Sequence, residues 1–199
     1  MVIIGTGGLA KDLVGSLARD FRHKSFYFYN DRADCLDELF VHRYPIIKSK
    51  LALIEHFTKH ENLFVSAIAN PVNRLRMTEK AKMWGGVLTT VIALRENVSE
   101  FSNISKGCII QPDVVVSSCV TIGEGTFLNC GVIIGHDVSI GEYCSFGPGA
   151  RVLGNVSIGS FSYIGCNSVI LPGIKIGNKV RIGVGKIIDS DIPDGTKIV

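Results

Sequence analysis

The chain has 199 residues, of which 46% are hydrophobic and 20% are charged, and its formal net charge is +3. This length suffices for one sizeable domain or for two modest ones. The basic excess is small and scattered, which argues against a nucleic-acid partner, because DNA- and RNA-binding proteins cluster their basic residues. No apolar run approaches the ~18 residues of a membrane span, and the first residues lack the basic and apolar regions of a signal peptide.

Residues 1–91 alternate short apolar runs with stretches of helical periodicity. VIIG at the start predicts a buried strand, which leads through a glycine turn into a helix over LAKDLVGSLARDF. FYFYND and NLFVSAIAN predict two further strands, and KSKLALIEHFTKH predicts a second helix. PVNRLRMTEKAKMWG predicts a third helix, with Pro71 in its first turn. This order is typical of a small α/β domain with a mainly parallel, Rossmann-like sheet.

The first turn, GTGGLA at residues 5–10, follows a strand and opens a helix. It matches the G-x-G-x-x-A fingerprint of dinucleotide-binding folds, in which glycines admit a phosphate to the helix N-terminus. Asp31, after the second strand, partly matches the acidic residue of that fingerprint. A domain of about 90 residues is short of two mononucleotide-binding halves, so a nucleotide diphosphate joined to a sugar suits it better than NAD. A tight turn without any ligand is the alternative explanation of the glycines.

From about Ser102 a six-residue repeat replaces the helical pattern. Fifteen successive positions, from Ile104 to Ile188 in steps of six, carry a large apolar residue. The next position is often Gly, and the position two before is usually small or β-branched. The pattern predicts a parallel β-helix over residues 92–199, with three hexads in each triangular coil of about 18 residues. We expect the large residues in the inside corners, the glycines at the bends, and an irregular tail over DSDIPDGTKIV.

The cysteines and histidines show no metal-binding arrangement. The six cysteines form no Cys-x-x-Cys pair and no zinc-like spacing, so we expect reduced thiols and a cytoplasmic location. They are Cys35, Cys108, Cys119, Cys130, Cys144 and Cys166. The repeat holds one histidine, His136, whereas catalytic zinc sites need about three protein ligands. The other histidines, His23, His42, His56 and His60, lie in the first half, so no metal is expected.

The repeat segment LNCGVIIGHDVSIGEYCSFGPGARVLGNVSIG is similar to the hexapeptide-repeat acyltransferases of bacterial nucleotide sugars and sialic acids. IIGTGGLAKDL, FYND and AIANPVNR resemble the small domain that these enzymes carry ahead of a left-handed β-helix. The resemblance covers essentially the whole chain and implies a left-handed coil, where the general rule for crossover connections favours a right hand. Two segments depart from the family: VIALREN lacks a histidine and a proline, and GTKIV stops before a usual Gly-x-Pro-Ala segment.

The resemblance implies acetyl-CoA as the donor, a homotrimer, and active sites between neighbouring β-helices. It points to the N-acetyltransferases of UDP- or GDP-linked 4-amino sugars and to the sialic acid O-acetyltransferase group, and it implies a role in surface polysaccharide or glycan assembly. Residues 1–91 would hold the nucleotide sugar, and residues 92–199 would carry the acyltransferase site. An O-acetyltransferase of sugars or sialic acids and a non-catalytic β-helix scaffold are the alternatives.

His136 and Asp137 are the candidate catalytic residues. They fall between the inward positions Ile134 and Val138 and are expected on the outer surface. A histidine near its ordinary pKa suits a general base for acyl transfer, and relatives carry their base at this position. Asp137 would fix the imidazole tautomer, as an acid of the relatives does, although adjacent residues on a strand point apart. One exposed polar residue on a solvated coil is the alternative for His136.

Stacking by one coil predicts that Gly154 lies above His136, where the missing side chain admits the pantetheine arm of a donor. The resemblance implies that Ser145 and Gly154 contact acetyl-CoA and that Asn129 contacts the acceptor; ordinary turn chemistry is the alternative. In the first half it implies a nucleotide-sugar site made of Gly7, Gly8, Leu9, Asn30, Asp31 and Ala69. Arg74 in NPVNR resembles a recurring arginine, with a solvated helix residue as the alternative.

Overall fold

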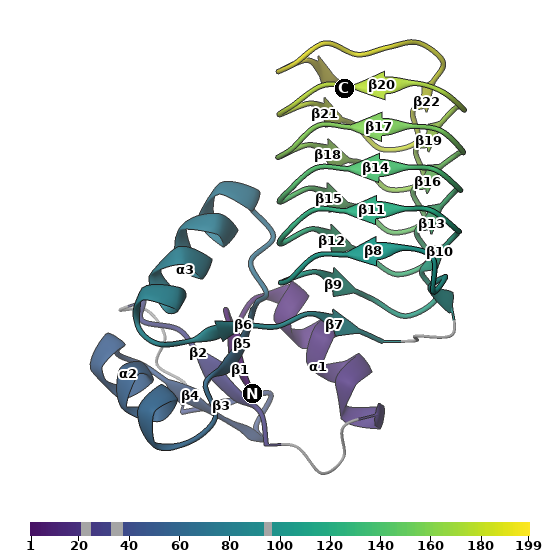
Figure 1. Cartoon of the computed structure of the whole chain (residues 1–199). Coiled ribbons are helices and arrows are strands. Elements are labelled where there is room, and N and C mark those ends of the chain that lie inside the picture. Colours follow the sequence, from purple (N-terminus) through teal and green to yellow (C-terminus); the bar gives the residue numbers. More distant parts are fainter. Residues whose placement is uncertain (21–24, 33–37, 94–96) are drawn as a thin grey trace. The chain divides into compact units, whose positions relative to one another are not determined.

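A computed structural model describes residues 1–20, 25–32, 38–93 and 97–199 (Figure 1). The chain divides into two compact units, Met1–Thr89 and Thr90–Val199, and each is taken by itself below. His23, Cys35 and three residues of the VIALREN segment, 94–96, lie outside the described residues.

The first unit is built on a six-stranded sheet with the order β3-β4-β2-β1-β5-β6. The strands are β1 (Val2–Ile4), β2 (Tyr27–Tyr29), β3 (Leu39–Phe40), β4 (Tyr44–Ile47), β5 (Leu63–Ser66) and β6 (Val87–Leu88). Every pairing is parallel except that of β3 with β4, so the expected mainly parallel sheet is confirmed. The strands β3, β4 and β6 were not predicted from the sequence.

Three helices cover the sheet: α1 (Gly8–Asp20), α2 (Lys50–Lys59) and α3 (Pro71–Met83), as predicted. Ser49 caps α2 by accepting a hydrogen bond from the amide of Ala52, and Asn70 caps α3 by accepting one from Asn73. Figure 1 shows α1 on one face of the sheet and α2 and α3 on the other. Alternate strand residues therefore supply two apolar layers; the α2–α3 side holds Val2, Ile4, Tyr29, Leu53, Phe57, Phe64, Ala81 and Leu88.

The order of the strands reverses at β1. Val2 pairs with Tyr27 of β2 on one side and with Phe64 of β5 on the other, and both pairings are parallel. The strand that follows β1 in the chain, β2, therefore lies on one side of β1, and the later strand β5 lies on the other side. In open parallel sheets, ligands bind outside the carboxyl ends of the strands at such a switch point.

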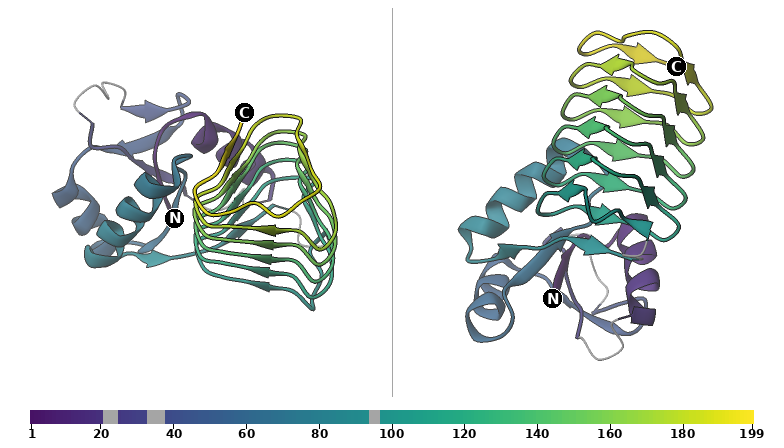
Figure 2. Two further views of the ribbon diagram at one scale, coloured as in Figure 1. Left: turned by 90° about the horizontal axis from the view of Figure 1, so that it is seen from above. Right: turned by 45° about the vertical axis from the view of Figure 1, so that its right-hand side comes forward.

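The second unit is a left-handed parallel β-helix of stacked, three-sided coils (Figure 2, left). Its first face holds β10 (Val115–Val116), β13 (Ile133–Ile134), β16 (Arg151–Val152), β19 (Val169–Ile170) and β22 (Ile187–Ile188). Its second face holds β8 (Asn103–Ile104), β11 (Thr121–Ile122), β14 (Ser139–Ile140), β17 (Ser157–Ile158) and β20 (Lys175–Ile176). Its third face holds β7 (Val91–Ile92), β9 (Ile109–Ile110), β12 (Phe127–Leu128), β15 (Ser145–Phe146), β18 (Tyr163–Ile164), β21 (Arg181–Ile182) and β23 (Lys197–Ile198).

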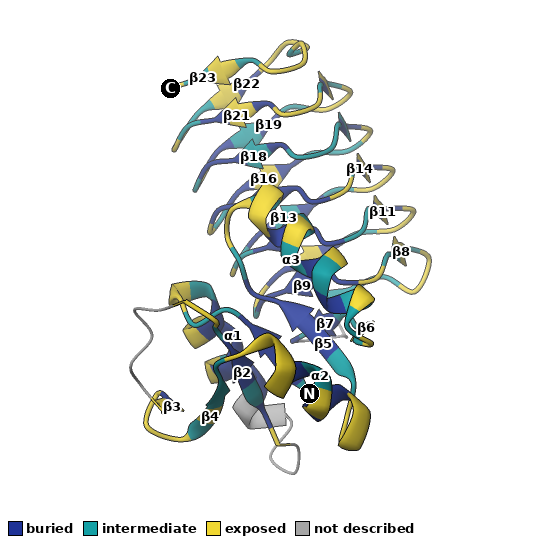
Figure 3. Cartoon of the chain, turned by 90° about the vertical axis from the view of Figure 1, so that its left-hand side faces the viewer, coloured by how far each residue is buried: buried dark blue, intermediate teal, exposed yellow. Residues whose placement is uncertain are grey.

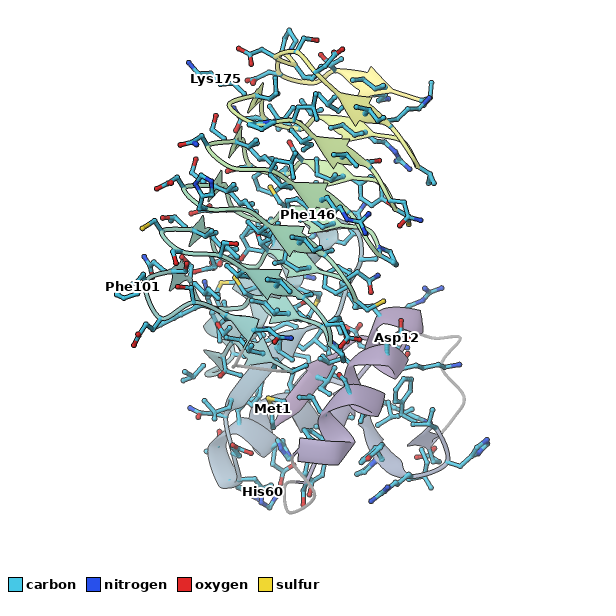
Figure 4. All side chains as sticks on the ribbon, turned by 90° about the vertical axis from the view of Figure 1, so that its right-hand side faces the viewer. Met1, Asp12, His60, Phe101, Phe146 and Lys175 are labelled. Atoms are coloured by element: carbon cyan, nitrogen blue, oxygen red, sulfur yellow. The ribbon has the colours of Figure 1, made fainter. Side chains whose placement is uncertain are left out.

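The large apolar residue of each hexad is the second residue of a strand, so it lies on a flat face and not in an inside corner as expected. These residues form one buried column inside the coils, in which Ile104 at the lower end is partly exposed. Figure 4 labels Phe146 of this column, and Lys175 and Phe101 on the outside. The small residues two positions before, such as Val132 and Ala150, directly follow the turns and are also buried.

The glycines that follow the large residues are explained by close contact between coils and not by strain at a bend. A Cβ at Gly135 would lie 2.8 Å from the backbone nitrogen of Gly154, although the φ of Gly135 is ordinary. The left-handed conformation recurs two positions later, where Asp137 and Asn155 have φ of 58° and 61°. Each corner therefore turns at the third residue after the buried one.

The last segment continues the β-helix, which corrects the expected irregular tail. Ile192 bridges to Ile176, and Lys197 pairs with Arg181, so this coil is two residues shorter than those below it. Figure 3 shows the same pattern of exposed turns and buried inner residues along the stack.

Candidate functional site

The first unit has a pocket of about 630 Å³ at the switch point of its sheet. It is lined by the turn after β1, the residues that follow β2 and β5, and one side of α3. The lining residues are Ile4, Gly5, Thr6, Gly7, Gly8, Leu9, Tyr29, Asn30, Asp31, Arg32, Ala67, Ile68, Ala69, Asn73 and Met77. The structure thus brings together all six residues of this half for which the sequence suggested a role in substrate binding.

The three glycines of the first turn differ in whether the fold requires them. Gly5 has φ of 109°, and a Cβ there would lie 2.9 Å from the carbonyl oxygen of Ala67, so the fold requires glycine. Gly7 and Gly8 have ordinary φ, and a Cβ on either would meet no atom within 4 Å. A tight turn therefore explains Gly5 alone, and the space beside Gly7 and Gly8 is open to a ligand.

The residues after β2 are held by side-chain hydrogen bonds. The amide nitrogen of Asn30 donates to the hydroxyl of Thr6 at 2.7 Å, and its oxygen accepts from the backbone of Arg32 at 3.1 Å. The hydroxyl of Tyr29 donates to Asp31 Oδ2 at 2.9 Å. Burial raises the pKa of the Tyr29 hydroxyl, and the hydrogen bond and charge of Asp31 raise that pKa further. Tyr29 therefore remains a donor that orients the Asp31 carboxylate at the pocket.

Several lining residues were missed by the sequence reasoning, including Thr6, Arg32, Asn73 and Met77. Asn73 and Met77 are four residues apart, so they share one side of α3, and this spacing could have revealed them. Arg32 carries no such signal, because its place in the pocket depends on the turn after β2.

Arg74 is buried, with 1% of its surface exposed, so the alternative of a solvated helix residue is wrong. Its Nη1 donates to the carbonyl oxygens of Ile68 at 2.8 Å and Ala69 at 3.0 Å. Arg74 does not itself line the pocket, whereas both of these acceptor residues do.

His136 and Asp137 form a turn between β13 and β14, at the edge where the first and second faces meet. His136 Nδ1 lies 2.8 Å from Asp137 Oδ2, and the two side chains are 64% and 54% exposed. The strand rule that argued against this contact does not apply, because Asp137 has left-handed φ and the pair lies in a turn. Neighbouring coils fix the backbone: Asp137 donates to Ser118, and the amide of Asn155 donates to His136.

The contact with Asp137 leaves Nε2 as the reactive nitrogen of the imidazole. A neutral ring that donates from Nδ1 to a carboxylate has its lone pair on Nε2. A Cβ at Gly154 would lie 2.6 Å from this Nε2, which confirms that Gly154 lies directly above His136. Glycine at position 154 therefore leaves room for the imidazole, whose side chain is 64% exposed.

Ser145 and Asn129 lie elsewhere around the coil. Ser145 is the buried first residue of β15 on the third face. Asn129 follows β12 at the edge between the third and first faces, where its side-chain oxygen accepts from the amide of Cys130 at 2.8 Å. Within one chain these two residues are therefore on other sides of the coil from His136 and Gly154.

The described residues contain no metal-binding cluster, no membrane-spanning helix and no disulfide. No group of three or more His, Cys, Asp and Glu side chains among them could hold a metal ion. None of their helices is both long enough and apolar enough to cross a membrane. The five cysteines that the structure describes are free thiols.

Two protein families match successive parts of the chain. Residues 1–81 match the PglD N-terminal domain, and residues 120–154 match the bacterial transferase hexapeptide (six repeats) family. A comparison with the curated protein sequences finds no match.

Solved structures resemble the whole chain. A mutant of perosamine N-acetyltransferase from Caulobacter crescentus, in complex with CoA and GDP-perosamine, has a TM-score of 0.89 and 26% identity, over 98% of this chain and 91% of its own. The acetyltransferase domain of PglB from Neisseria gonorrhoeae has a TM-score of 0.87 and 27% identity, over 98% and 94%. Its complex with acetyl coenzyme A has a TM-score of 0.75 and 26% identity, over 98% and 93%.

The two family matches and the matched structures together support a hexapeptide-repeat sugar acetyltransferase. The pocket of this acetyltransferase lies in the part that matches the PglD N-terminal domain. The segment that matches the hexapeptide family contains all the site residues suggested in the repeat, which are Asn129, His136, Asp137, Ser145 and Gly154.

Proposed function

We propose that this acetyltransferase transfers the acetyl group of acetyl-CoA to the 4-amino group of a UDP- or GDP-linked sugar, for surface glycan biosynthesis, with His136 as the general base. The observation that carries the proposal is the 2.8 Å contact of His136 Nδ1 with Asp137, which leaves Nε2 free of the carboxylate and next to Gly154. The structural neighbours that bind GDP-perosamine and CoA support the same class of acceptor and donor.

The chemistry needs one base that works in both directions. His136 Nε2 removes a proton from the attacking amine as its nitrogen forms a bond to the thioester carbonyl carbon. Asp137 stabilises the imidazolium that results, without itself taking the proton. When the C–S bond breaks, the imidazolium returns the proton to the leaving thiolate, which gives the N-acetyl sugar and free CoA.

The acceptor site is the pocket of the first unit. Gly7 and Gly8 lie at the start of α1, where unpaired backbone N–H groups favour a phosphate, and the fold alone does not require them to be glycine. One switch point and one glycine turn suit a single nucleotide diphosphate with its sugar. Leu9, Asn30, Asp31 and Ala69 complete the proposed contacts with it.

The donor site is formed by Gly154 beside the base and by Ser145 on the third face. The outward residues above Ser145 on that face are Tyr163, Arg181 and Lys197, in successive coils. Arg181 lies 5.4 Å from the centre of the Tyr163 ring. Two cations and an aromatic ring complement the phosphates and the adenine of acetyl-CoA.

The catalytic assembly is a homotrimer, in which one chain supplies His136 and its neighbour supplies Ser145 and Asn129. One chain holds these groups on different sides of its coil, so a second copy is needed to complete the site. The first face offers a contact surface, because its outward residues are mostly apolar: Val115, Ile133, Arg151, Val169 and Ile187. The second face presents polar residues instead: Asn103, Thr121, Ser139, Ser157 and Lys175.

Incubation with acetyl-CoA and a panel of acceptors tests the proposal. The panel contains UDP-, GDP- and dTDP-linked 4-amino sugars and sialic acids, and the release of free thiol is followed. We expect turnover with a nucleotide-linked amino sugar and labelled acetyl on nitrogen. Label on oxygen would identify the O-acetyltransferase instead. Coenzyme binding without turnover of any acceptor would favour a non-catalytic scaffold.

A further inference from the structure

Arg74 is a buried cation placed behind the loop that follows β5. It lies in the second turn of α3, and its backbone amide donates to Asn70, the N-cap of that helix. Its side chain extends back along the chain, where Nη1 donates to the carbonyls of Ile68 and Ala69. A buried guanidinium is retained only where its hydrogen bonds offset the cost of burying its charge.

These two hydrogen bonds fix the direction of two peptide groups. No peptide bond between described residues is cis, and in a trans peptide the N–H points opposite to the C=O. Because the carbonyls of Ile68 and Ala69 face Arg74, the N–H groups of Ala69 and Asn70 point away from it. None of the described residues accepts a hydrogen bond from either N–H.

The loop is also fixed at its first residue. The amide of Ala67 donates to the carbonyl of Ile4 at 2.9 Å, and Gly5 packs against the carbonyl of Ala67. The sheet therefore holds Ala67, and Arg74 holds the next two residues. Ala67, Ile68 and Ala69 all line the pocket, so the loop presents a rigid backbone surface to it.

We propose that Arg74 is a positioning residue for the nucleotide sugar. It holds the loop so that the N–H groups of Ala69 and Asn70 donate to acceptor oxygens of the bound nucleotide diphosphate or its sugar. This inference rests on the proposed function of the pocket. Arg74 acts through the loop and does not touch the substrate.

Lysine cannot replace arginine in this role. One Arg74 nitrogen reaches two successive carbonyls from a planar group of fixed geometry, whereas a lysine ammonium is a flexible point charge. Arg74→Lys keeps the charge and removes the fixed geometry, so it separates loop positioning from simple charge. Arg76→Lys is the matched control, because Arg76 lies on the same helix and is exposed.

The test measures the binding of UDP and of GDP by isothermal titration calorimetry, beside steady-state kinetics. For Arg74→Lys and Arg74→Ala we expect nucleotide Kd and nucleotide-sugar KM to rise about tenfold or more. The KM for acetyl-CoA should change less than about twofold, and Arg76→Lys should match wild type in every value. Guanidinium at low concentration should restore nucleotide binding to Arg74→Ala, because it can occupy the buried site that the side chain leaves.

The outcomes separate this inference from the proposed function. Unchanged nucleotide Kd in folded Arg74→Lys, or equal losses toward nucleotide and acetyl-CoA, would overturn the positioning role. Wild type that binds a nucleotide but acetylates no acceptor would contradict the proposed reaction, and the Kd values of the variants would still decide the role of Arg74. Wild type that binds neither UDP nor GDP would overturn the inference together with the pocket. Thermal unfolding of each variant shows which of them are folded.

Discussion

Single residues show where the demands of folding and of ligand binding differ. Gly5 is required by its backbone conformation and by the carbonyl of Ala67, whereas Gly7 and Gly8 face open space. A Cβ at Gly154 would contact the imidazole of His136 at 2.6 Å, so a side chain there would displace the ring. The sequence alone could not separate these cases, because a glycine motif does not show which atoms lie next to each glycine.

Gly8→Ala should weaken substrate binding without weakening the fold. Its methyl group enters open space at the start of α1, so the stability of the folded protein should change by less than about 1 kcal/mol. If a phosphate or sugar occupies that space, the KM for the nucleotide sugar rises about tenfold or more. Gly15→Ala on the same helix is the control, since its Cβ is also uncontacted and lies outside the pocket. Equal KM values for the two variants would place the substrate elsewhere.

At the scale of elements, buried hydroxyls join successive coils of the β-helix. Ser162 Oγ donates to the carbonyl of Gly177 at 2.9 Å and accepts from the amide of Val180 at 3.0 Å. Thr126 makes the same pair of bonds two coils lower, to Gly141 and from Cys144. These hydroxyls form hydrogen bonds with backbone N–H and C=O groups that the two-residue strands leave unpaired.

Ser162→Ala should destabilise the β-helix by about 1–3 kcal/mol, because it leaves a buried carbonyl and a buried amide without their partner. Ser157→Ala, at an outward position of β17, should change stability by less than about 0.5 kcal/mol. Denaturant unfolding of the two variants measures the difference. Equal stabilities would show that the hydroxyl ladder contributes nothing.

The six-residue repeat was the pattern from which the structure could be predicted best. The hexad predicted the phase of all fifteen inward positions, of which all but Ile104 are buried, since a coil of fixed size repeats the same contact. It did not give the place of those residues on the flat faces, nor the contact of His136 with Asp137, because both depend on where the left-handed residue lies in each turn. The burial of Arg74 was missed because its partners are backbone carbonyls, which leave no trace in a residue pattern.

For the whole molecule, the distribution of outward side chains differs between faces. The first face carries Ile187 at 71% exposure and Val115 at 40% within a mostly apolar column. His136 and Ser145 lie on different sides of one chain. Association through the first face would cover apolar surface and bring residues of two chains to one site.

Ile133→Glu should therefore reduce both assembly and turnover. Ile133 is the outward residue of β13 on the first face, and a buried glutamate at a contact between copies is strongly unfavourable. Ser139→Glu, outward on β14 of the second face in the same coil, should leave assembly and turnover unchanged. Sedimentation would report a trimer for wild type and Ser139→Glu, and smaller species for Ile133→Glu. A trimeric, active Ile133→Glu would rule out the first face as the contact.

The central claim is that one imidazole at a turn of the β-helix moves the proton of acetyl transfer. The most direct test compares kcat/KM of His136→Ala with wild type, using acetyl-CoA and the best acceptor of the panel. Because the side chain is largely exposed, we expect unchanged thermal unfolding together with a loss of about 10²-fold or more in rate. Wild-type turnover in folded His136→Ala would contradict the account.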